Sequence, residues 1–138
     1  MEDCIFCKII NGEIPSFKIF ENDDVYSFAD INPISKGHTL IIPKAHYENI
    51  WEIPENNLLA IHSASKKIAA AISDVLQPAG IACLQLNGRA VNQVVMHYHL
   101  HLIPRMADGP ELGMTAWELV SGDMAEIQSI SEKIASVL

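Results

Sequence analysis

Three of the six histidines of this chain lie at alternate positions of one short segment, at His97, His99 and His101. Successive side chains of a strand point to opposite faces, so these three imidazoles would share one face. His97 and His101 would lie about 13 Å apart, too far for one metal ion to bind all three. Imidazole is also a nucleophile and an acid or base near neutral pH, so we expect the middle residue, His99, to carry chemistry. A polar, histidine-rich sheet face is the alternative.

A second candidate site is the pair Cys4 and Cys7. Their C-x-x-C spacing matches half of a tetrahedral zinc site, and histidines could supply the other half because the chain has no second C-x-x-C. A thioredoxin-like redox pair would follow a strand in a βαβ unit, and none is expected before Cys4. Two free cysteines in an N-terminal turn remain the alternative. Cys83 lies in the apolar run IACLQL and is predicted to be a core residue.

The composition is that of a globular chain and excludes several kinds of protein. With 138 residues, 49% apolar and 19% charged, we expect one domain over residues 1–138. No apolar run approaches the about 18 residues of a membrane span, and the acidic N-terminus is unlike a secretory signal. A net charge of −8 argues against binding a nucleic-acid backbone. Three cysteines, an odd number, fit a reducing compartment, so we predict a cytoplasmic protein with no membrane or nucleic-acid partner.

The elements that position these residues follow from hydrophobic periodicity and turn signals. The strongest signal is a helix over residues 54–76, in which Ile61, Ile68 and Ile72 repeat at the helical period. Further helices are predicted at 4–10 and 123–137, and strands at 17–21, 25–30, 38–42, 81–87 and 94–103. Hairpin-like strands, a long helix and more strands predict an α+β fold with an antiparallel sheet. No glycine-rich phosphate loop is present.

The segment HYHLHLI fits the pattern His-φ-His-φ-His-φ-φ, where φ is hydrophobic, and resembles the signature of the histidine triad (HIT) family. The segments CIFCKIINGEIP, FADINPISKGHTLIIPKAH and NQVVMHYHLHLIPR look like the Hint-type branch, in the same order. The resemblance covers residues 4–105 and leaves 106–138 as a C-terminal extension. It implies a HIT-like α+β fold with a five-stranded antiparallel sheet, one long helix, a short N-terminal helix and a C-terminal helix. It also implies a homodimer joined into a ten-stranded sheet.

The family resemblance implies a purine nucleotide ligand, of AMP or GMP type, and a set of site residues. His99 matches the nucleophile, and His101 and His38 match its supporting histidines. Asp30 matches the carboxylate that accepts the ribose hydroxyls. Matching polar contacts to phosphate and leaving group are Gln93 and Asn87, and the matching base pocket is formed by Phe6, Ile9, Ile14 and Ile31.

The resemblance also implies a structural zinc ion held by Cys4, Cys7, His46 and His97. Two positions depart from the family pattern. Val94 stands where relatives often have a serine or threonine that contacts phosphate, and Asn92 stands in place of a common glycine. A valine side chain offers no hydrogen bond to phosphate. We expect both departures to affect the preference for a leaving group.

The activity implied is hydrolysis at the α-phosphate of nucleoside phosphoramidates or dinucleoside polyphosphates. It would proceed through a nucleotidyl-histidine and release a nucleoside monophosphate. Two alternatives stay open. One is transfer of the nucleotidyl group to phosphate or a sugar phosphate, and the other is a nucleotide-binding scaffold dimer whose hydrolysis is incidental.

Overall fold

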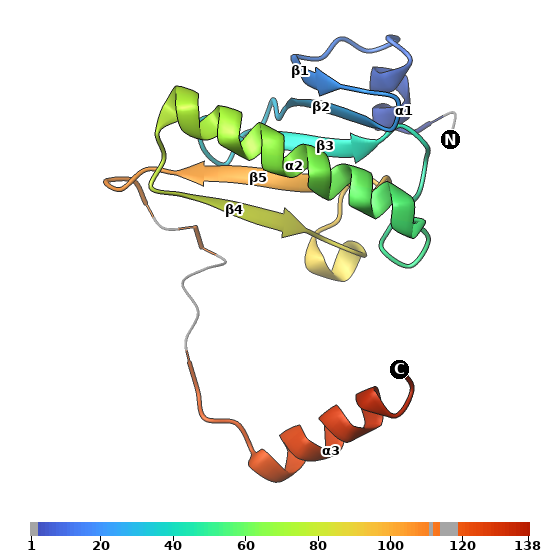
Figure 1. Ribbon diagram of the computed structural model, residues 1–138, viewed down its shortest axis with the longest axis vertical. Helices are drawn as coiled ribbons and strands as arrows, with labels where there is room; N and C mark the ends of the chain where they lie inside the picture. Colours follow the sequence, from blue (N-terminus) through green and yellow to red (C-terminus); the bar gives the residue numbers. More distant parts are fainter. Residues whose placement is uncertain (1–2, 111, 114–118) are drawn as a thin grey trace.

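A five-stranded antiparallel sheet in the order β1-β2-β3-β5-β4 forms the centre of the computed structural model (Figure 1). The structure describes residues 3–110, 112–113 and 119–138. Its strands are β1 (Lys18–Glu21), β2 (Val25–Ala29), β3 (Thr39–Pro43), β4 (Gly80–Gln85) and β5 (Leu100–Arg105), and its helices are α1 (Ile5–Ile10), α2 (Glu55–Leu76), the 3-10 turn η1 (Arg89–Val91) and α3 (Met124–Ala135). The expected α+β class and five-stranded antiparallel sheet are confirmed.

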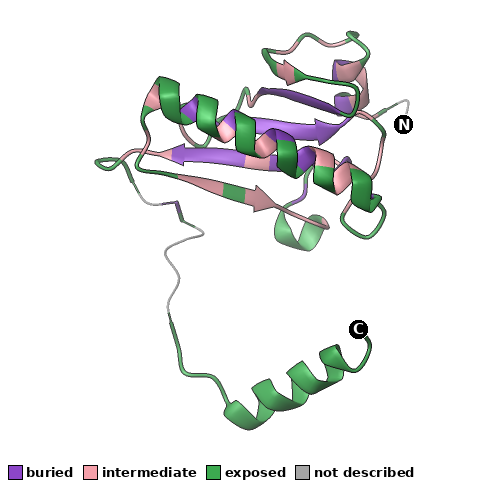
Figure 2. Ribbon diagram, in the orientation of Figure 1, coloured by how far each residue is buried: buried purple, intermediate pink, exposed green. Residues whose placement is uncertain are grey.

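Helix α2 closes one face of the sheet. Its buried stripe consists of Ile61, Ala64, Ile68 and Ile72, as the periodicity predicted. These side chains pack against residues of the central strands, among them Val25, Ile41, Leu100 and Leu102. Figure 2 shows α2 lying along strands β3 and β5, which are almost wholly buried. Tyr98 and Leu100 point into the core beneath α2. Because side chains alternate along the segment, the histidines between and beside them point to the opposite face of the sheet.

Helix α1 covers only part of that opposite face. Phe6 and Ile9 are its buried residues, and they pack on Phe28 and Leu40 of strands β2 and β3. The α1 helix is six residues long and ends at Asn11. Among the residues that the structure describes, no α-helix covers this face over β5 and β4, and the uncovered part holds the histidines.

The histidine segment is less regular than predicted. A strand was expected over residues 94–103, but β5 starts only at Leu100 and continues to Arg105. Residues 94–99 bend instead, and the N–H of Tyr98 donates to the carbonyl of Tyr47 at 2.6 Å. The side chains still alternate, because Tyr98 packs in the α2 core whereas His97 and His99 lie on the other side. The histidines therefore share a face as predicted, although residues 94–99 of the predicted strand are not in a strand.

One further expectation fails at the edge of the sheet, and the helix expected at the C-terminus is found. Cys83 was predicted to be buried, but β4 is an edge strand and Cys83 is exposed. Helix α3 forms as expected, capped by Asp123, yet none of its residues is buried, and Figure 1 shows it standing apart from the sheet. Among the residues that the structure describes, no helix is long and apolar enough to cross a membrane.

Candidate functional site

A pocket of about 550 Å³ lies on the sheet face that α2 leaves open. It contains His99 and His101 together with Asp30, and its walls come from α1, the end of β2 and the segment that follows β4. Its lining is Ile5, Phe6, Ile9, Ile14, Pro15, Ser16, Phe28, Ala29, Asp30, Ile31, Asn32, Ile34, Leu40, Leu84, Leu86, Val91, Asn92, Val94, Val95, His99 and His101. The pocket thus combines a mostly apolar wall with a small group of polar side chains, as ligand sites do.

A backbone hydrogen bond fixes the tautomer of His99. Its Nδ1–H donates to the carbonyl of His97 at 2.7 Å, which leaves the lone pair of the neutral ring on Nε2. Burial lowers the pKa of His99, partly opposed by this hydrogen bond and by the charge of Asp30. The ring is therefore neutral at pH 7, the form in which an imidazole nitrogen can attack.

His38 and His101 form a hydrogen-bonded chain beside His99. The N–H of Ile34 donates to Nδ1 of His38 at 3.0 Å, so the proton of His38 lies on Nε2. That N–H donates to Nδ1 of His101 at 2.9 Å, which places the proton of His101 on its own Nε2. Burial lowers the pKa of His38 and lowers that of His101 to about 4. Neutral His101 therefore has one N–H to offer a ligand in the pocket.

The α1 side of the pocket suits a nucleoside. Phe6 meets the His99 ring edge-on, with the ring centroids 5.2 Å apart. The predicted base-pocket residues Phe6, Ile9, Ile14 and Ile31 all line this pocket, and Phe28 joins them. Asp30 stands at the end of β2, where its Oδ1 accepts the N–H of Asn32 at 2.8 Å and its Oδ2 lies 3.6 Å from Nε2 of His38.

The structure does not bring two of the predicted polar contacts into the pocket. The side chain of Gln93 is buried, accepting from the N–H of Gly88 at 2.7 Å and donating to the carbonyl of Glu48 at 2.6 Å. Asn87 is bonded to Gln85 and accepts the N–H of Ile50 at 2.8 Å. Their hydrogen-bonding groups hold the loop behind the pocket.

Three apolar residues on strand β4 and the loop after it also line the pocket. Leu84, Leu86 and Val91 line the pocket, and the sequence reasoning singled out none of them. One signal could have found Leu84, because a β4 residue that faces the histidine strand must share its face. In the ladder, Leu84 pairs directly with His101.

A second cluster brings Cys4, Cys7, His46 and His97 together, with their ligand atoms all within 4.8 Å of one another. Nδ1 of His97 lies 3.5 Å from Sγ of Cys4, 3.6 Å from Sγ of Cys7 and 3.2 Å from Nδ1 of His46. Tetrahedral zinc, with Zn–S of about 2.3 Å and Zn–N of about 2.0–2.1 Å, places sulfur and nitrogen ligands about 3.6 Å apart and two nitrogens about 3.4 Å apart. The donor set fits such an ion.

The protonation of this cluster also suits a cation. The Nε2–H of His97 donates to the carbonyl of Pro43 at 2.8 Å, so its Nδ1 lone pair faces the two sulfurs. Burial lowers the pKa of His97 to about 4, and burial together with Cys4 raises that of the Cys7 thiol to about 11. Two thiolates side by side therefore require a positive charge between them.

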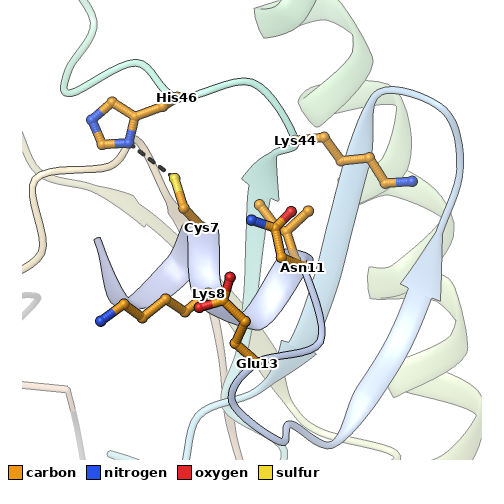
Figure 3. Close-up of a pocket in the computed structure, with 7 residues that line it drawn as sticks. Cys7, Lys8, Asn11, Glu13, Lys44 and His46 are labelled. Atoms are coloured by element: carbon orange, nitrogen blue, oxygen red, sulfur yellow. Dashed lines mark hydrogen bonds between the residues drawn. The ribbon is translucent and has the colours of Figure 1, made fainter. Parts of the chain in front are cut away.

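The outer side of the cysteine cluster opens into a separate pocket. Cys7 and His46 line it, with Lys8, Asn11 and Lys44 around them (Figure 3). Figure 3 shows the Cys7 and His46 side chains directed at each other, at 3.3 Å between Sγ and Nδ1. The pocket that contains His99 is not lined by these two residues, so an ion held by the cysteine cluster would be reached from outside without passing His99.

Comparisons with known proteins agree with this architecture. The family model for the HIT domain matches residues 11–108. "Protein hit" of Bacillus subtilis is 44% identical, covering 99% of this chain and 95% of that protein. Adenosine 5'-monophosphoramidase HNT1 of Candida albicans is 41% identical, and the match covers 98% of this chain and 91% of that protein. A crystal structure of a HIT family member from B. subtilis has a TM-score of 0.91 at 43% identity, covering 99% of this chain and 97% of that chain. This chain belongs to the HIT family.

Proposed function

We propose that this protein is a nucleotide hydrolase that cleaves at the α-phosphate of a nucleoside phosphoramidate or a dinucleoside polyphosphate. The observation that carries the proposal is the tautomer of His99, whose Nε2 lone pair faces a pocket with an apolar wall and a carboxylate. The relative from Candida albicans is named for phosphoramidase activity, which supports phosphoramidates as the first class to test.

The reaction proceeds by two displacements at phosphorus. Nε2 of His99 forms a bond to the α-phosphorus as the P–N or P–O bond breaks, and the leaving group keeps the electron pair. An amine leaving group takes up one proton from solvent in this step. Water then attacks the phosphorus of nucleotidyl-His99, the bond from phosphorus to Nε2 breaks, and the nucleoside monophosphate is released. The water gives up one proton to solvent, so the net reaction is hydrolysis.

The other pocket residues bind and polarise the substrate. The Nε2–H of His101 makes no hydrogen bond with the described residues, so it is available to donate to a phosphoryl oxygen and stabilise its charge. His38 holds His101 in that tautomer and acts as a positioning residue. The Asp30 carboxylate accepts from the two ribose hydroxyls, and the α1 side holds the base.

We also propose that the cluster of Cys4, Cys7, His46 and His97 holds one structural zinc ion. A closed set of four protein ligands leaves no open position, which is typical of structural sites. Bound zinc would tie α1 to the chain after β3 and to the histidine segment. His97 is bonded through its carbonyl to Nδ1 of His99, so fixing His97 also fixes the nucleophile.

The function is tested with a panel of adenosine phosphoramidates, dinucleoside polyphosphates and nucleotide sugars. Release of AMP from at least one class is expected, and no turnover of any of them contradicts the proposal. Adding inorganic phosphate and measuring ADP separates transfer from hydrolysis. Tight AMP binding with negligible turnover would instead indicate a scaffold.

Replacing Asp30 with asparagine is expected to weaken AMP binding by about tenfold or more, because a hydrogen bond to a charged group contributes about 1.5–3 kcal/mol. Binding of 2',3'-dideoxy-AMP, which lacks both hydroxyls, should change little. Calorimetric titration of both ligands measures the difference. The control is Asp23→Asn in the exposed β1–β2 turn, which should bind both ligands as the wild type does. An equal loss for both ligands in the Asp30 variant would contradict the ribose contact.

We propose that the protein is a homodimer joined along β4 into a ten-stranded sheet. β4 is an edge strand that carries Ile81, Cys83 and Leu84, and none of its six residues is a lysine or a proline. Edge strands without such residues are prone to pair with another strand.

Light scattering is expected to give twice the 15.2 kDa of the chain. Cys83→Lys should shift the protein toward monomer, because the two copies would bring like charges together at the shared edge. Ile19→Lys on the opposite edge strand, β1, is the control and should leave the mass unchanged. A monomeric wild type, or a dimer unaffected by Cys83→Lys, would count against pairing through β4.

A further inference from the structure

Ser16 is a polar residue of the pocket that the proposed reaction does not use. It lies just before β1, and its Oγ is 2.8 Å from the phenol oxygen of Tyr26. Tyr26 is only 8% exposed and belongs to the buried cluster that includes Phe6, Ile9 and Phe28. The Ser16–Tyr26 pair therefore brings a hydroxyl group to the apolar wall that is proposed to hold the base.

Burial of the tyrosine decides which of the two hydroxyls donates. Among the described residues, neither oxygen has another hydrogen-bond partner. If Ser16 were the donor, the phenol O–H of Tyr26 would be left without a protein acceptor in a mostly buried position, which is unfavourable. The phenol therefore donates to Oγ of Ser16. The proton of Ser16 is then free for an acceptor in the pocket, toward which Ser16 is partly exposed.

The pairing of β1 with β2 places Ser16 beside Asp30. The N–H of Ala29 donates to the carbonyl of Phe17 at 3.0 Å, and the two strands are antiparallel. The residues next to this pair, Ser16 and Asp30, therefore face each other where the two strands continue. Both line the same pocket. A ribose held by the Asp30 carboxylate thus brings the nearer edge of its base to the Ser16 hydroxyl.

We propose that Ser16 donates a hydrogen bond to N3 of a purine base and that Tyr26 is the positioning residue for its hydroxyl. This proposal rests on the proposed function, in which the nucleoside binds with its ribose at Asp30. In the anti conformation of a purine nucleoside, N3 lies on the edge of the base next to the 2'-hydroxyl, and N7 lies on the opposite edge. A donor beside the carboxylate that binds the 2'- and 3'-hydroxyls therefore meets N3, which is an acceptor.

The contact would add chemical selection to a wall that otherwise selects by shape. Phe6, Ile9, Ile14 and Phe28 cover a flat ring but offer it no donor or acceptor from their side chains. A site that forms a hydrogen bond with a ligand group disfavours an analogue without that group, because the polar atom of the protein then loses its partner. An analogue with C–H in place of N3 should therefore bind more weakly.

The test is the affinity of the wild-type protein for AMP, 3-deaza-AMP and 7-deaza-AMP, measured by calorimetric titration at a pH where all three bases are uncharged. 3-Deaza-AMP is expected to bind about three- to tenfold more weakly than AMP, the range of one neutral hydrogen bond. 7-Deaza-AMP should bind as AMP does, because its altered atom lies on the edge away from Ser16.

Three variants of the pair test the two roles. Ser16→Ala should bind AMP more weakly by a similar factor and bring the affinity ratio of AMP to 3-deaza-AMP to about one, because neither ligand then has the contact. Ser16→Thr retains the hydroxyl and should retain a ratio above one. Tyr26→Phe keeps the ring in the core and should reduce the ratio, because the Ser16 hydroxyl is no longer held. The matched control is Ser63→Ala on the exposed side of α2, which should leave affinity and ratio unchanged.

The outcomes separate this inference from the proposed function. A wild-type ratio of about one, a larger loss with 7-deaza-AMP, or an equal loss of both AMP and 3-deaza-AMP in Ser16→Ala would overturn the contact to N3 and leave the hydrolase function standing. A wild-type ratio in Tyr26→Phe would overturn the role of Tyr26. If the expected ratios are found but no phosphoramidate or polyphosphate is cleaved, only the hydrolase function fails. If AMP does not bind to the wild type, both proposals fail.

Discussion

Replacing His99 with alanine is expected to lower kcat/KM on an adenosine phosphoramidate by at least about 10³-fold, the scale of losing a covalent nucleophile. The reason is geometric. The carbonyl of His97 holds the proton on Nδ1 and leaves Nε2 of His99 as the ring nitrogen that faces the pocket with its lone pair. A second, more specific readout is the nucleotidyl-enzyme, which mass spectrometry of the quenched wild-type reaction should detect and which the variant should lack.

The controls for this variant address folding and specificity. AMP should still bind to His99→Ala, because Asp30 and the apolar wall on the α1 side remain. The matched control is His62→Ala, which removes an exposed histidine of α2 on the other face of the sheet and should retain full activity. If His99→Ala keeps more than a few per cent of the activity, or still forms the adduct, another residue is the nucleophile.

The fold was predictable where hydrophobic periodicity alone decides the structure. The stripe on α2 is determined by burial against the sheet, so Ile61, Ile68 and Ile72 identified both the helix and its inner face. The alternation around Tyr98 also predicted which side the histidines take. The length of the histidine strand was not predictable, because a tertiary hydrogen bond from Tyr98 to Tyr47 replaces the ladder there.

The site was predictable in its residue types and less so in its side-chain directions. Residues 86–95 lie in a loop whose path is set by its own hydrogen bonds and has no periodicity to read. Gln93 and Asn87 satisfy backbone groups of that loop and of residues 48–50, so neither amide faces the pocket. Loop amides compete for backbone partners in ways that sequence spacing does not reveal.

The burial of Cys83 on the edge strand β4 and of the apolar residues of α3 cannot be read from the sequence of one chain. An apolar run such as the one around Cys83 predicts a strand, but its exposure depends on its place in the sheet order. Helix α3 has the apolar spacing of a packed helix, with Ile127, Ile130 and Ile134 all about half exposed. Periodicity predicts that an apolar face exists and leaves open which molecule covers it.

Cys7→Ser is expected to reduce the bound zinc from one ion per chain to almost none and to lower the melting temperature by about 10–15 °C. A ligand present at a thousand times its dissociation constant stabilises the fold by about 4 kcal/mol, and about 3 °C per kcal/mol is typical of a domain of this size. The four-ligand cluster joins α1 to residues 43–46 and to the histidine segment, so its loss should loosen these parts together. Metal analysis by mass spectrometry and calorimetry measure the two effects.

Cys83→Ser is the matched control for the zinc site, because it makes the same chemical change at a cysteine outside the cluster and adds no charge at the proposed β4 dimer edge, so it should retain both the zinc and the melting temperature. A chelator should reproduce the effect of Cys7→Ser in the wild type, since Cys7 and His46 line an outer pocket that solvent reaches. Adding zinc back should restore the wild type but not the variant. If Cys7→Ser keeps a full equivalent of zinc, the ion binds elsewhere, and if it loses zinc without a change in melting temperature, the cluster binds metal without stabilising the fold.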